Sequence, residues 1–201
     1  MPPRHSRARG GTLQEGRSTL AAGPCKAAER WGQGSSTRRT GSSDYGRVMP
    51  LEGEYEPSPE AWVREQVERY EATGGREANT LRDTGLPVAV FSTRGARSGK
   101  VRKQALMRVE HEGAYAMVGS QGGAPKDPAW VANLRAHPDQ VTVQDGPEPW
   151  DGVAREVTGE EKRQWWERAV EVYPPYADYQ RRTDREIPVF VVERADPVNP
   201  A

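Results

Sequence analysis

A short segment of the sequence, residues 95–103 (GARSGKVRK), gathers cations, a hydroxyl and two glycines. Its charged and hydroxyl side chains are Arg97, Ser98, Lys100, Arg102 and Lys103. This set suits phosphate or polycarboxylate ligands, because charge-assisted hydrogen bonds and free backbone N–H groups both favour anions. The segment is one residue short of the phosphate-loop pattern GxxxxGK, and Val101 replaces the hydroxyl residue that should follow, so that loop is excluded. A solvated β-turn with basic residues is the alternative.

A second glycine-containing segment follows at Ser120–Trp130 (SQGGAPKDPAW). Gly122 and Gly123 would let the backbone approach a flat ligand closely. Lys126 and the free N–H groups at the start of the next helix offer a second anion site. The alternative is an ordinary loop in which Asp127 caps that helix.

Three tyrosines recur at every third residue, namely Tyr173, Tyr176 and Tyr179, just after a segment that contains two tryptophans. Aromatic residues at helical spacing usually pack in a core. Two consecutive prolines interrupt this helix, however, and the flanking residues are polar. Phenols beside a cleft stack on planar ligands and exchange protons, so these tyrosines are candidate catalytic residues.

Several common sites are missing from the sequence. No GxGxxG follows an expected strand, no GxSxG is present, and the histidines His5, His111 and His137 are scattered, so we expect no metal site. Residues 1–48 hold nine Lys/Arg against three Asp/Glu, whereas the remainder holds twenty against twenty-six. A mildly acidic body does not suggest a protein that binds nucleic acid.

The hydrophobic pattern predicts a mainly β domain with peripheral helices. Strands are expected at residues 86–93, 103–110, 114–120, 140–144, 150–157 and 187–193, and the second and third flank a hairpin loop at residues 111–113. Most connections are too short for parallel crossovers, so the strands should form a closed or half-closed antiparallel barrel.

Three helices should lie around this barrel. The first is expected at residues 59–72, with Ser58 as its cap, Trp62 on its apolar stripe and Gly74-Gly75 as the signal that ends it. The second should begin at Asp127-Pro128 and end before Pro138, with Trp130 and Leu134 on one face. The third should begin with the capping box Thr158–Glu161 and carry Trp166, Val170 and Tyr173 on one stripe.

The first 48 residues are rich in Gly, Ser and Arg and show no apolar period, which predicts a disordered basic tail before a domain at residues 49–201. Translation starting at Met49 is an alternative explanation of this stretch. Cys25 is the only cysteine, and no apolar run approaches the roughly 18–20 residues that span a bilayer. No secretory signal is recognisable, so we expect a cytoplasmic protein.

Taken in order, these segments resemble the F420-dependent, or deazaflavin-dependent, nitroreductase family of actinobacteria. The resemblance runs from about Tyr70 to Glu193. Its carriers are the turn at Gly95–Arg102, the segment Ser120–Leu134 and the segment Tyr173–Arg185, which Ile187-Pro188 closes. Each motif alone is weak, but three in order at matching separations are specific.

The resemblance implies a split antiparallel β-barrel, like that of flavin-binding reductases of the pyridoxamine-phosphate oxidase type, and coenzyme F420. The positions matching the lactyl-phosphate part of F420 are Ala96, Arg97, Ser98, Arg102, Lys103, Gln104 and Ala105. Those bordering the deazaflavin ring are Val118, Gly119, Ser120 and Gln121. Those on the side of the polyglutamate tail are Ala129, Trp130, Val131, Ala132 and Asn133. Further expected coenzyme contacts are Lys100, Gly122 and Lys126.

Ser120 and the three tyrosines match positions at the ring face and the acceptor pocket. Two positions depart from the family pattern: Ala96 replaces a residue that is often basic, and Gln121 stands where lysine is common. Either change would weaken the grip on an anionic coenzyme, which the remaining cations would have to supply.

The expected reaction is transfer of hydride from reduced F420 to a quinone, a nitroaromatic or a similar electron-poor acceptor. One alternative is an FMN-binding NAD(P)H reductase on the same barrel, and another is a non-catalytic F420 carrier. The expected partner is a small-molecule acceptor, with a monomer or homodimer as the assembly. Peripheral contact with the inner face of the plasma membrane, for access to a quinone, is a further expectation.

We predict that removal of residues 1–48 leaves the domain's function unchanged, because that stretch lacks the apolar period needed for a packed core. A chain beginning at Met49 should keep the melting temperature and F420 affinity of the full chain. A loss of several degrees, measured by differential scanning fluorimetry, would contradict this.

Overall fold

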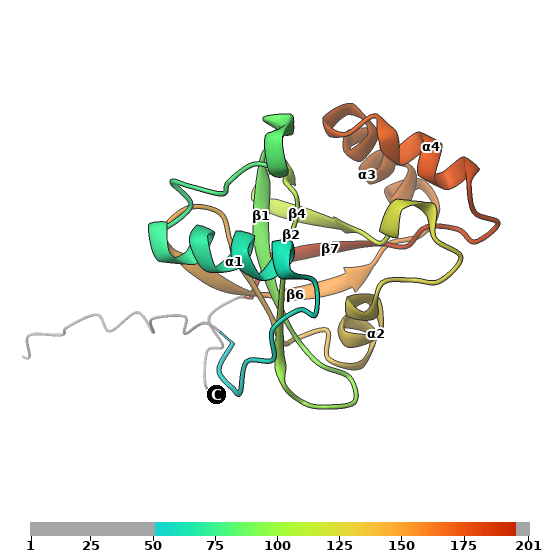
Figure 1. The fold of residues 1–201 in the computed structure, drawn as a ribbon. Coiled ribbons are helices and arrows are strands. Elements are labelled where there is room, and N and C mark those ends of the chain that lie inside the picture. The colour runs from blue at the N-terminus through green and yellow to red at the C-terminus, as the bar shows by residue number, and fades with distance from the viewer. Residues whose placement is uncertain (1–50, 196–201) are drawn as a thin grey trace, which may run out of the picture. The chain divides into compact units, whose positions relative to one another are not determined.

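An antiparallel sheet of seven strands dominates the computed structural model, which describes residues 51–195 (Figure 1). The strands are β1 (Val88–Arg94), β2 (Val101–Met107), β3 (Val109–His111), β4 (Ala114–Val118), β5 (Val141–Gln144), β6 (Pro149–Glu156) and β7 (Val189–Arg194). The α-helices are α1 (Ala61–Thr73), α2 (Ala129–Ala136), α3 (Gly159–Val172) and α4 (Pro175–Arg181), with 3-10 turns η1 (Arg82–Thr84) and η2 (Gln121–Gly123). The tail expected at residues 1–48 lies outside the described residues, as do residues 49–50 and 196–201 of the expected domain.

The strand order shows how the sheet closes. It is β2-β1-β5-β6-β7-β4-β3, with every neighbouring pair antiparallel. β2 and β3 therefore lie at opposite ends of the order, yet Arg108 alone separates them in the chain. The sheet must curl until its two ends approach each other, which is the split antiparallel barrel expected from the sequence.

Hydrogen bonds hold the chain where it passes between the two ends. The Arg108 backbone N–H donates to the carbonyl of Pro87 at 2.9 Å, and its guanidinium Nε donates to Asp145 Oδ2 at 2.5 Å. The same carboxylate oxygen accepts a hydrogen bond from the hydroxyl of Tyr115 at 2.8 Å. Asp145 thus links β4 and the β2–β3 junction to the loop after β5.

The expected hairpin between β3 and β4 is confirmed. His111 pairs with Ala114, which leaves Glu112 and Gly113 as a two-residue loop. Both loop residues have positive φ, 52° and 82°, as a type I′ turn requires. The single strand expected at residues 103–110, in contrast, is divided, because Arg108 lies between two strands that pair with different neighbours.

Side chains are buried on both faces of the sheet. Val88 and Val90 of β1 belong to a first core, whereas Ala89 and Phe91 belong to a second. β7 alternates in the same way, with Val189 in the first core. Two covered faces explain why these strands are uninterrupted apolar runs rather than alternating ones.

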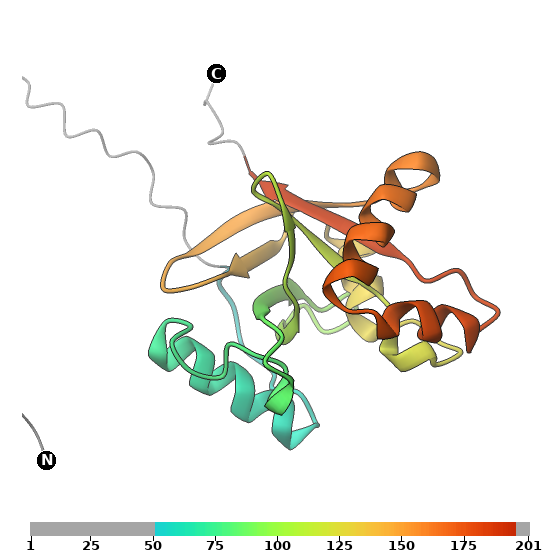
Figure 2. The same ribbon diagram turned by 90° about the horizontal axis from the view of Figure 1, so that it is seen from above.

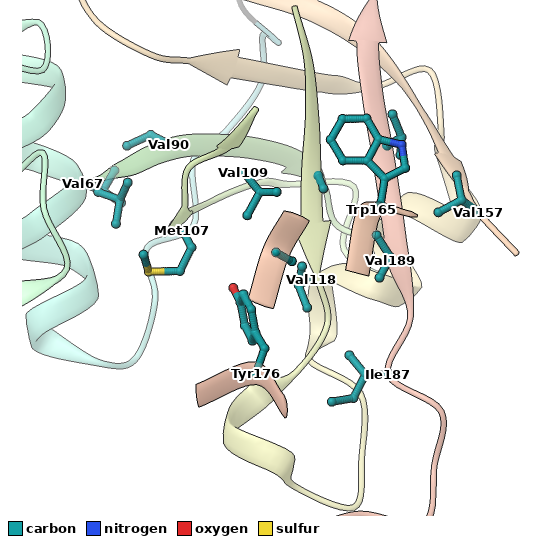
Figure 3. Close-up of a cluster of buried hydrophobic side chains, with 14 of the residues drawn as sticks. Val67, Val90, Met107, Val109, Val118, Val157, Trp165, Tyr176, Ile187 and Val189 are labelled. Atoms are coloured by element: carbon teal, nitrogen blue, oxygen red, sulfur yellow. The ribbon is translucent and has the colours of Figure 1, made fainter. Parts of the chain in front are cut away.

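Different helices cover the two cores. Figure 3 shows the first core, where Val67 of α1, Trp165 of α3 and Tyr176 of α4 join the sheet residues. Seen from above, α1 and the α3–α4 pair lie at opposite ends of this assembly (Figure 2). The second core receives Trp130 and Leu134 from α2, as the sequence predicted.

The first helix differs from expectation at its start. α1 begins at Ala61 rather than residue 59, and the Ser58 hydroxyl accepts a hydrogen bond from the Glu60 N–H at 3.2 Å, before the first turn. Trp62 is not on the buried stripe; it is 39% exposed, with the Arg82 guanidinium 4.4 Å from its ring centroid. The helix ends at Thr73, one residue beyond the expected residue 72, because Gly74 and Gly75 adopt left-handed conformations.

The capping box expected for α3 does not form. Thr158 precedes the helix in an extended conformation but makes no side-chain cap hydrogen bond. Glu161 is turned instead toward Arg155 of β6, which donates to its two carboxylate oxygens at 2.7 and 2.6 Å. The apolar face is wider than expected: the expected residues Trp166, Val170 and Tyr173 pack half-buried against the first core, and the neighbouring Trp165 and Ala169 are buried.

Helix α4 was not expected from the sequence. Pro174 does end the preceding helix, but Pro175 occupies the first position of a new one. A proline at this position costs no backbone hydrogen bond, and its fixed φ suits a helix start. The two prolines thus redirect the chain between helices, and Tyr176 becomes a buried residue of the second of them.

We predict that replacing valine by threonine lowers the free energy of unfolding far more on one strand of this sheet than on another. Val143 is fully buried in the second core, whereas Val153 is 45% exposed. Val143→Thr places a hydroxyl among apolar side chains and should lower the free energy of unfolding by about 1–3 kcal/mol. Val153→Thr should change it by less than about 0.5 kcal/mol. Urea denaturation measures both free energies, and equal losses would contradict the burial of Val143 in the second core and the exposure of Val153.

Candidate functional site

A groove of about 610 Å³ opens between α1 with the segment before it, the β1–β2 turn, β2 and α2. Ten of the residues predicted to bind a coenzyme line it: Ala96, Arg97, Ser98, Arg102, Lys103, Gln104, Ala129, Trp130, Ala132 and Asn133. The structure therefore brings the basic turn and the expected tail-side helix to one place. Gly95 of the basic turn also lines the groove, together with Glu56, Ser58, Pro59 and Val63, for which no binding role was expected from the sequence.

Helix α2 holds the basic turn in place. Asn133 Oδ1 accepts the backbone N–H of Ala96 at 2.9 Å, and Asn133 Nδ2 donates to Thr93 Oγ1 at 3.2 Å. Within the turn, the Gly95 N–H donates to the Lys100 carbonyl at 2.8 Å. Gly99 has a φ of 67°, a left-handed conformation that favours glycine. Asn133 is thus a buried clamp that fixes the turn's backbone as well as a residue of the groove.

The cations around the groove differ in their pairing. Arg97 is exposed, and no carboxylate among residues 51–195 lies within ion-pair distance of it. Arg102 pairs with Glu56 at 2.6 Å, and Lys103 pairs with Glu71 at 2.7 Å. In the part of the chain that the structure describes, Arg97 is the lining cation that offers its full charge to an incoming anion.

The wall of the groove also contains an unpaired hydrogen-bond donor. The Nε2 atom of Gln104 is buried and has no hydrogen-bond partner within residues 51–195. A buried amide without a partner costs free energy that a ligand carbonyl or hydroxyl would recover. A free guanidinium and an orphaned donor among the residues of one groove fit a coenzyme with an anionic tail and polar carbonyl groups.

The other predicted coenzyme residues lie outside this lining. Lys100 is turned toward Glu54, at 2.7 Å, and Lys126 is exposed beyond η2. Val118 and the partly buried Ala105 pack in the first core, while Val131 is fully buried in the second. The remaining ones, Gly119, Ser120, Gln121 and Gly122, form the loop after β4.

Arg185 organises this loop, and the sequence analysis assigned it no role. Its side chain is only 16% exposed and reaches back about sixty residues along the chain. The guanidinium donates to the carbonyls of Gly119, Ser120 and Ala124, each at 2.9 Å, and to Asp127 Oδ1 at 2.7 Å. Four bonds from one guanidinium join the loop to the start of α2. The Thr-Asp-Arg sequence that ends the third motif was the available signal.

Gly123 serves helix packing. A Cβ atom at this position would lie 2.7 Å from the Tyr179 carbonyl oxygen and 3.0 Å from Arg182 Cβ. The glycine therefore lets η2 press against α4, whereas the sequence analysis explained it by close approach to a ligand. The Cβ atom that Gly122 lacks would meet nothing within 4 Å, so space beside that residue remains open.

The three tyrosines form one cluster but differ in burial. Tyr176 is 5% exposed and belongs to the first core. Tyr173 and Tyr179 are half-buried, and their hydroxyl oxygens lie 3.1 Å apart. The ring centroids of Tyr173 and Tyr176 are 5.0 Å apart in an edge-to-face arrangement.

The environment of these phenols keeps them protonated. The hydrogen bond to Tyr179, together with burial, raises the pKa of Tyr173 to about 12. Burial also raises the pKa of Tyr176. At neutral pH, both are therefore hydrogen-bond donors and weak acids.

Comparison with known proteins identifies relatives of this chain. The model of the F420H(2)-dependent quinone reductase family matches residues 62–194. An F420H(2)-dependent quinone reductase of Mycobacterium tuberculosis is 33% identical over 128 residues, which cover 62% of this chain and 85% of that protein.

Two solved structures are also similar. One, described as an F420-H2 dependent reductase, is 57% identical, with a TM-score of 0.51, and the match covers 53% of this chain and 94% of that one. The other, described as a domain-swapped dimer, is 53% identical, with a TM-score of 0.53, and covers 68% of this chain and all of that one.

These matches confirm the resemblance drawn from the three sequence motifs, together with the expected coenzyme and class of reaction. The family match at residues 62–194 includes the loop after β4 and the tyrosine cluster. It also includes the groove, except for the lining residues that precede α1. The chain belongs to the F420H(2)-dependent quinone reductase family, whose members are oxidoreductases that use coenzyme F420.

Proposed function

We propose that this chain passes hydride from reduced F420 to a quinone, and that the groove at the basic turn holds the anionic tail of the coenzyme. The observation that carries the proposal is the groove itself, where Arg97 and Gln104 line the same 610 Å³ space and the buried amide nitrogen of Gln104 has no hydrogen-bond partner among residues 51–195. The name of the family supports a quinone as the acceptor. Nitroaromatics and other conjugated electrophiles share the electron-poor character that the reaction needs.

When bound, reduced F420 supplies a hydride from the ring carbon that stands in place of the flavin N5. The chain's own residues have to bind, orient and shield. Arg97 would hold the phosphate or a tail carboxylate, and Gln104 would donate a hydrogen bond from the wall. Arg185 would keep the Gly119–Ser120 backbone in place, which leaves the Ser120 hydroxyl as a polar contact for the ring.

The tyrosine pair would orient the acceptor. Two hydroxyls in contact share one of their protons, so the second O–H of Tyr173 and Tyr179 remains free to donate to an acceptor oxygen. A phenol whose pKa is about 12 stays protonated at neutral pH, so it has an O–H to donate but is a poor general acid. We therefore assign orientation to this pair and a supporting wall to the buried Tyr176.

The family match favours this reaction over the two alternatives. An FMN-binding NAD(P)H reductase on the same barrel would need less positive charge beside the tail, whereas this groove has three lining cations, Arg97, Arg102 and Lys103. A non-catalytic carrier would bind F420 without turnover, and the family is one of reductases.

Two features bear on partners. No helix within residues 51–195 has the length and apolar character that crossing a membrane requires. The exposed Trp62 under Arg82 supports peripheral contact with an anionic membrane surface, where a quinone would be reached. A homologous chain described as a domain-swapped dimer supports a homodimer as the assembly.

We predict that Arg97→Ala lowers the affinity for F420 by about 1.5–3 kcal/mol, because it removes a charge-assisted hydrogen bond. Arg102→Ala should lower the affinity for F420 by less, because Arg102 has to give up its ion pair with Glu56 when it binds a ligand. Both losses should shrink as salt rises. Fluorescence titration with F420, beside FMN, measures them. Arg69→Ala is the matched control, because Arg69 pairs with Glu77 outside the groove. Unchanged affinity in both groove variants would refute the proposed site.

We predict that Tyr179→Phe and Tyr173→Phe lower kcat/KM for a quinone about 2- to 10-fold, because each removes one partner of the hydroxyl pair. F420 affinity should not change. Tyr176→Phe is the internal control and should leave turnover unaltered, because its hydroxyl makes no hydrogen bond within residues 51–195. Steady-state kinetics with a soluble menaquinone analogue decides. A larger effect at Tyr176 than at Tyr179 would overturn the assignment.

A further inference from the structure

A short acidic segment of the chain lies along one side of the groove. Residues 52–56 read EGEYE and precede α1. Backbone hydrogen bonds fix this segment beside the first residue of β2: the Val101 N–H donates to the Glu54 carbonyl at 2.8 Å, and the Glu56 N–H donates to the Val101 carbonyl at 2.9 Å. A parallel bridge between Tyr55 and Val101 completes the attachment. We call residues 54–56 the acidic strap.

The strap places its carboxylates on cations that were expected to bind the coenzyme. Glu56 meets Arg102 at 2.6 Å, and both residues line the groove. Glu54 meets Lys100 at 2.7 Å, just outside the lining. The hydrogen bond and charge of Glu54 raise the pKa of Lys100, so this cation stays fully charged.

These carboxylates belong to the same chemical class as the groups that the groove would receive. The tail of F420 carries a phosphate and glutamate carboxylates, and a guanidinium binds either kind of oxyanion through the same N–H donors. Arg102 cannot give its charge fully to the tail while Glu56 keeps it. The negative charge of Glu56 also opposes the approach of any further anion.

We infer that Glu56 is an internal competitor for the anionic tail of the coenzyme at Arg102, and that it limits the affinity gained from that tail. The inference rests on the proposed function, because it takes the groove as the tail's binding site. When the tail is absent, Glu56 neutralises Arg102; when the tail enters, its oxyanion takes over the guanidinium and Glu56 turns to solvent.

The exposure of the pair makes such an exchange feasible. The side chains of Arg102 and Glu56 are 32% and 40% exposed. An ion pair at this exposure is weak, so a ligand with several anionic groups displaces one carboxylate at little cost. Each turnover also consumes one reduced coenzyme, and a competitor that returns to Arg102 assists exchange of the used coenzyme.

The competitor has a signature that an ordinary binding residue lacks, because removing its charge should tighten binding. Glu56→Gln keeps the size of the side chain and a hydrogen-bond acceptor for Arg102 but removes the negative charge. We expect it to raise the affinity for F420 about two- to five-fold at low salt, the range expected for a half-exposed ion pair. The gain should shrink as salt rises, because the electrostatic competition is screened.

Two ligands and two backgrounds separate the explanations. The full chain is titrated by fluorescence with F420 and with the phosphate-free 8-hydroxy-5-deazaflavin, which has no anionic tail and whose affinity should not change. In the Arg102→Ala background Glu56→Gln removes only the direct repulsion between Glu56 and the tail, so the part of the gain that comes from competition for Arg102 should be lost. Glu77→Gln, at the surface pair with Arg69, is the matched control and should leave both affinities as they are.

The outcomes distinguish failure of the competitor from failure of the proposed binding site. If Glu56→Gln binds F420 no better than the parent while Arg97→Ala and Arg102→Ala still weaken binding, the groove stands and the competitor is refuted. If Glu56→Gln weakens binding, Glu56 instead orients Arg102, and the inference is wrong. If the two arginine variants bind F420 like the parent, the proposed site fails and the competitor fails with it. Equal gains for both ligands would also overturn it, because the effect would not come from the tail.

Discussion

The rest of the structure depends on a single-residue link between the two ends of the sheet. Arg108 joins β2 to β3, although these strands stand at opposite ends of the strand order. One residue spans less than 4 Å, so the sheet must curl until its ends meet. Each face of the curled sheet buries its own apolar core. The ion pair between Arg108 and Asp145 holds the chain where it crosses from β2 to β3.

The site follows from the same packing. Strand β2 carries Arg102 and Gln104 into the groove and then, about 10 Å farther along, Met107 into the first core. Helix α2 buries Leu134 in the second core, and the adjacent Asn133 is thereby presented to the β1–β2 turn, whose backbone it holds. The groove is thus bounded by elements that the two cores already hold rigid, which suits a site that must orient a coenzyme precisely enough for hydride transfer.

Most cations around the site are paired with carboxylates. Arg102 and Lys103 each have a carboxylate partner from an element that borders the groove, while Arg97 has none among residues 51–195. Arg185 differs from these, because its guanidinium donates hydrogen bonds to three backbone carbonyls and to Asp127. Arginines therefore have different surroundings at the two positions: Arg185 organises backbone, whereas Arg97 has no carboxylate partner among residues 51–195 and is the arginine proposed to bind the coenzyme.

Local patterns in the sequence predicted the mainly antiparallel barrel, the end of α1 at Gly74-Gly75 and the hairpin at Glu112-Gly113, because backbone conformation at such points depends on a few neighbouring residues. They also singled out the basic turn, whose residues share one short segment, as a candidate anion site, and the structure places several of these residues in the groove. Tertiary structure decided the features that join distant segments. Glu161 turned from its cap to Arg155 of β6, and Arg185 reached a loop about sixty residues away. Such contacts leave no period in the sequence, so only the packed chain reveals them.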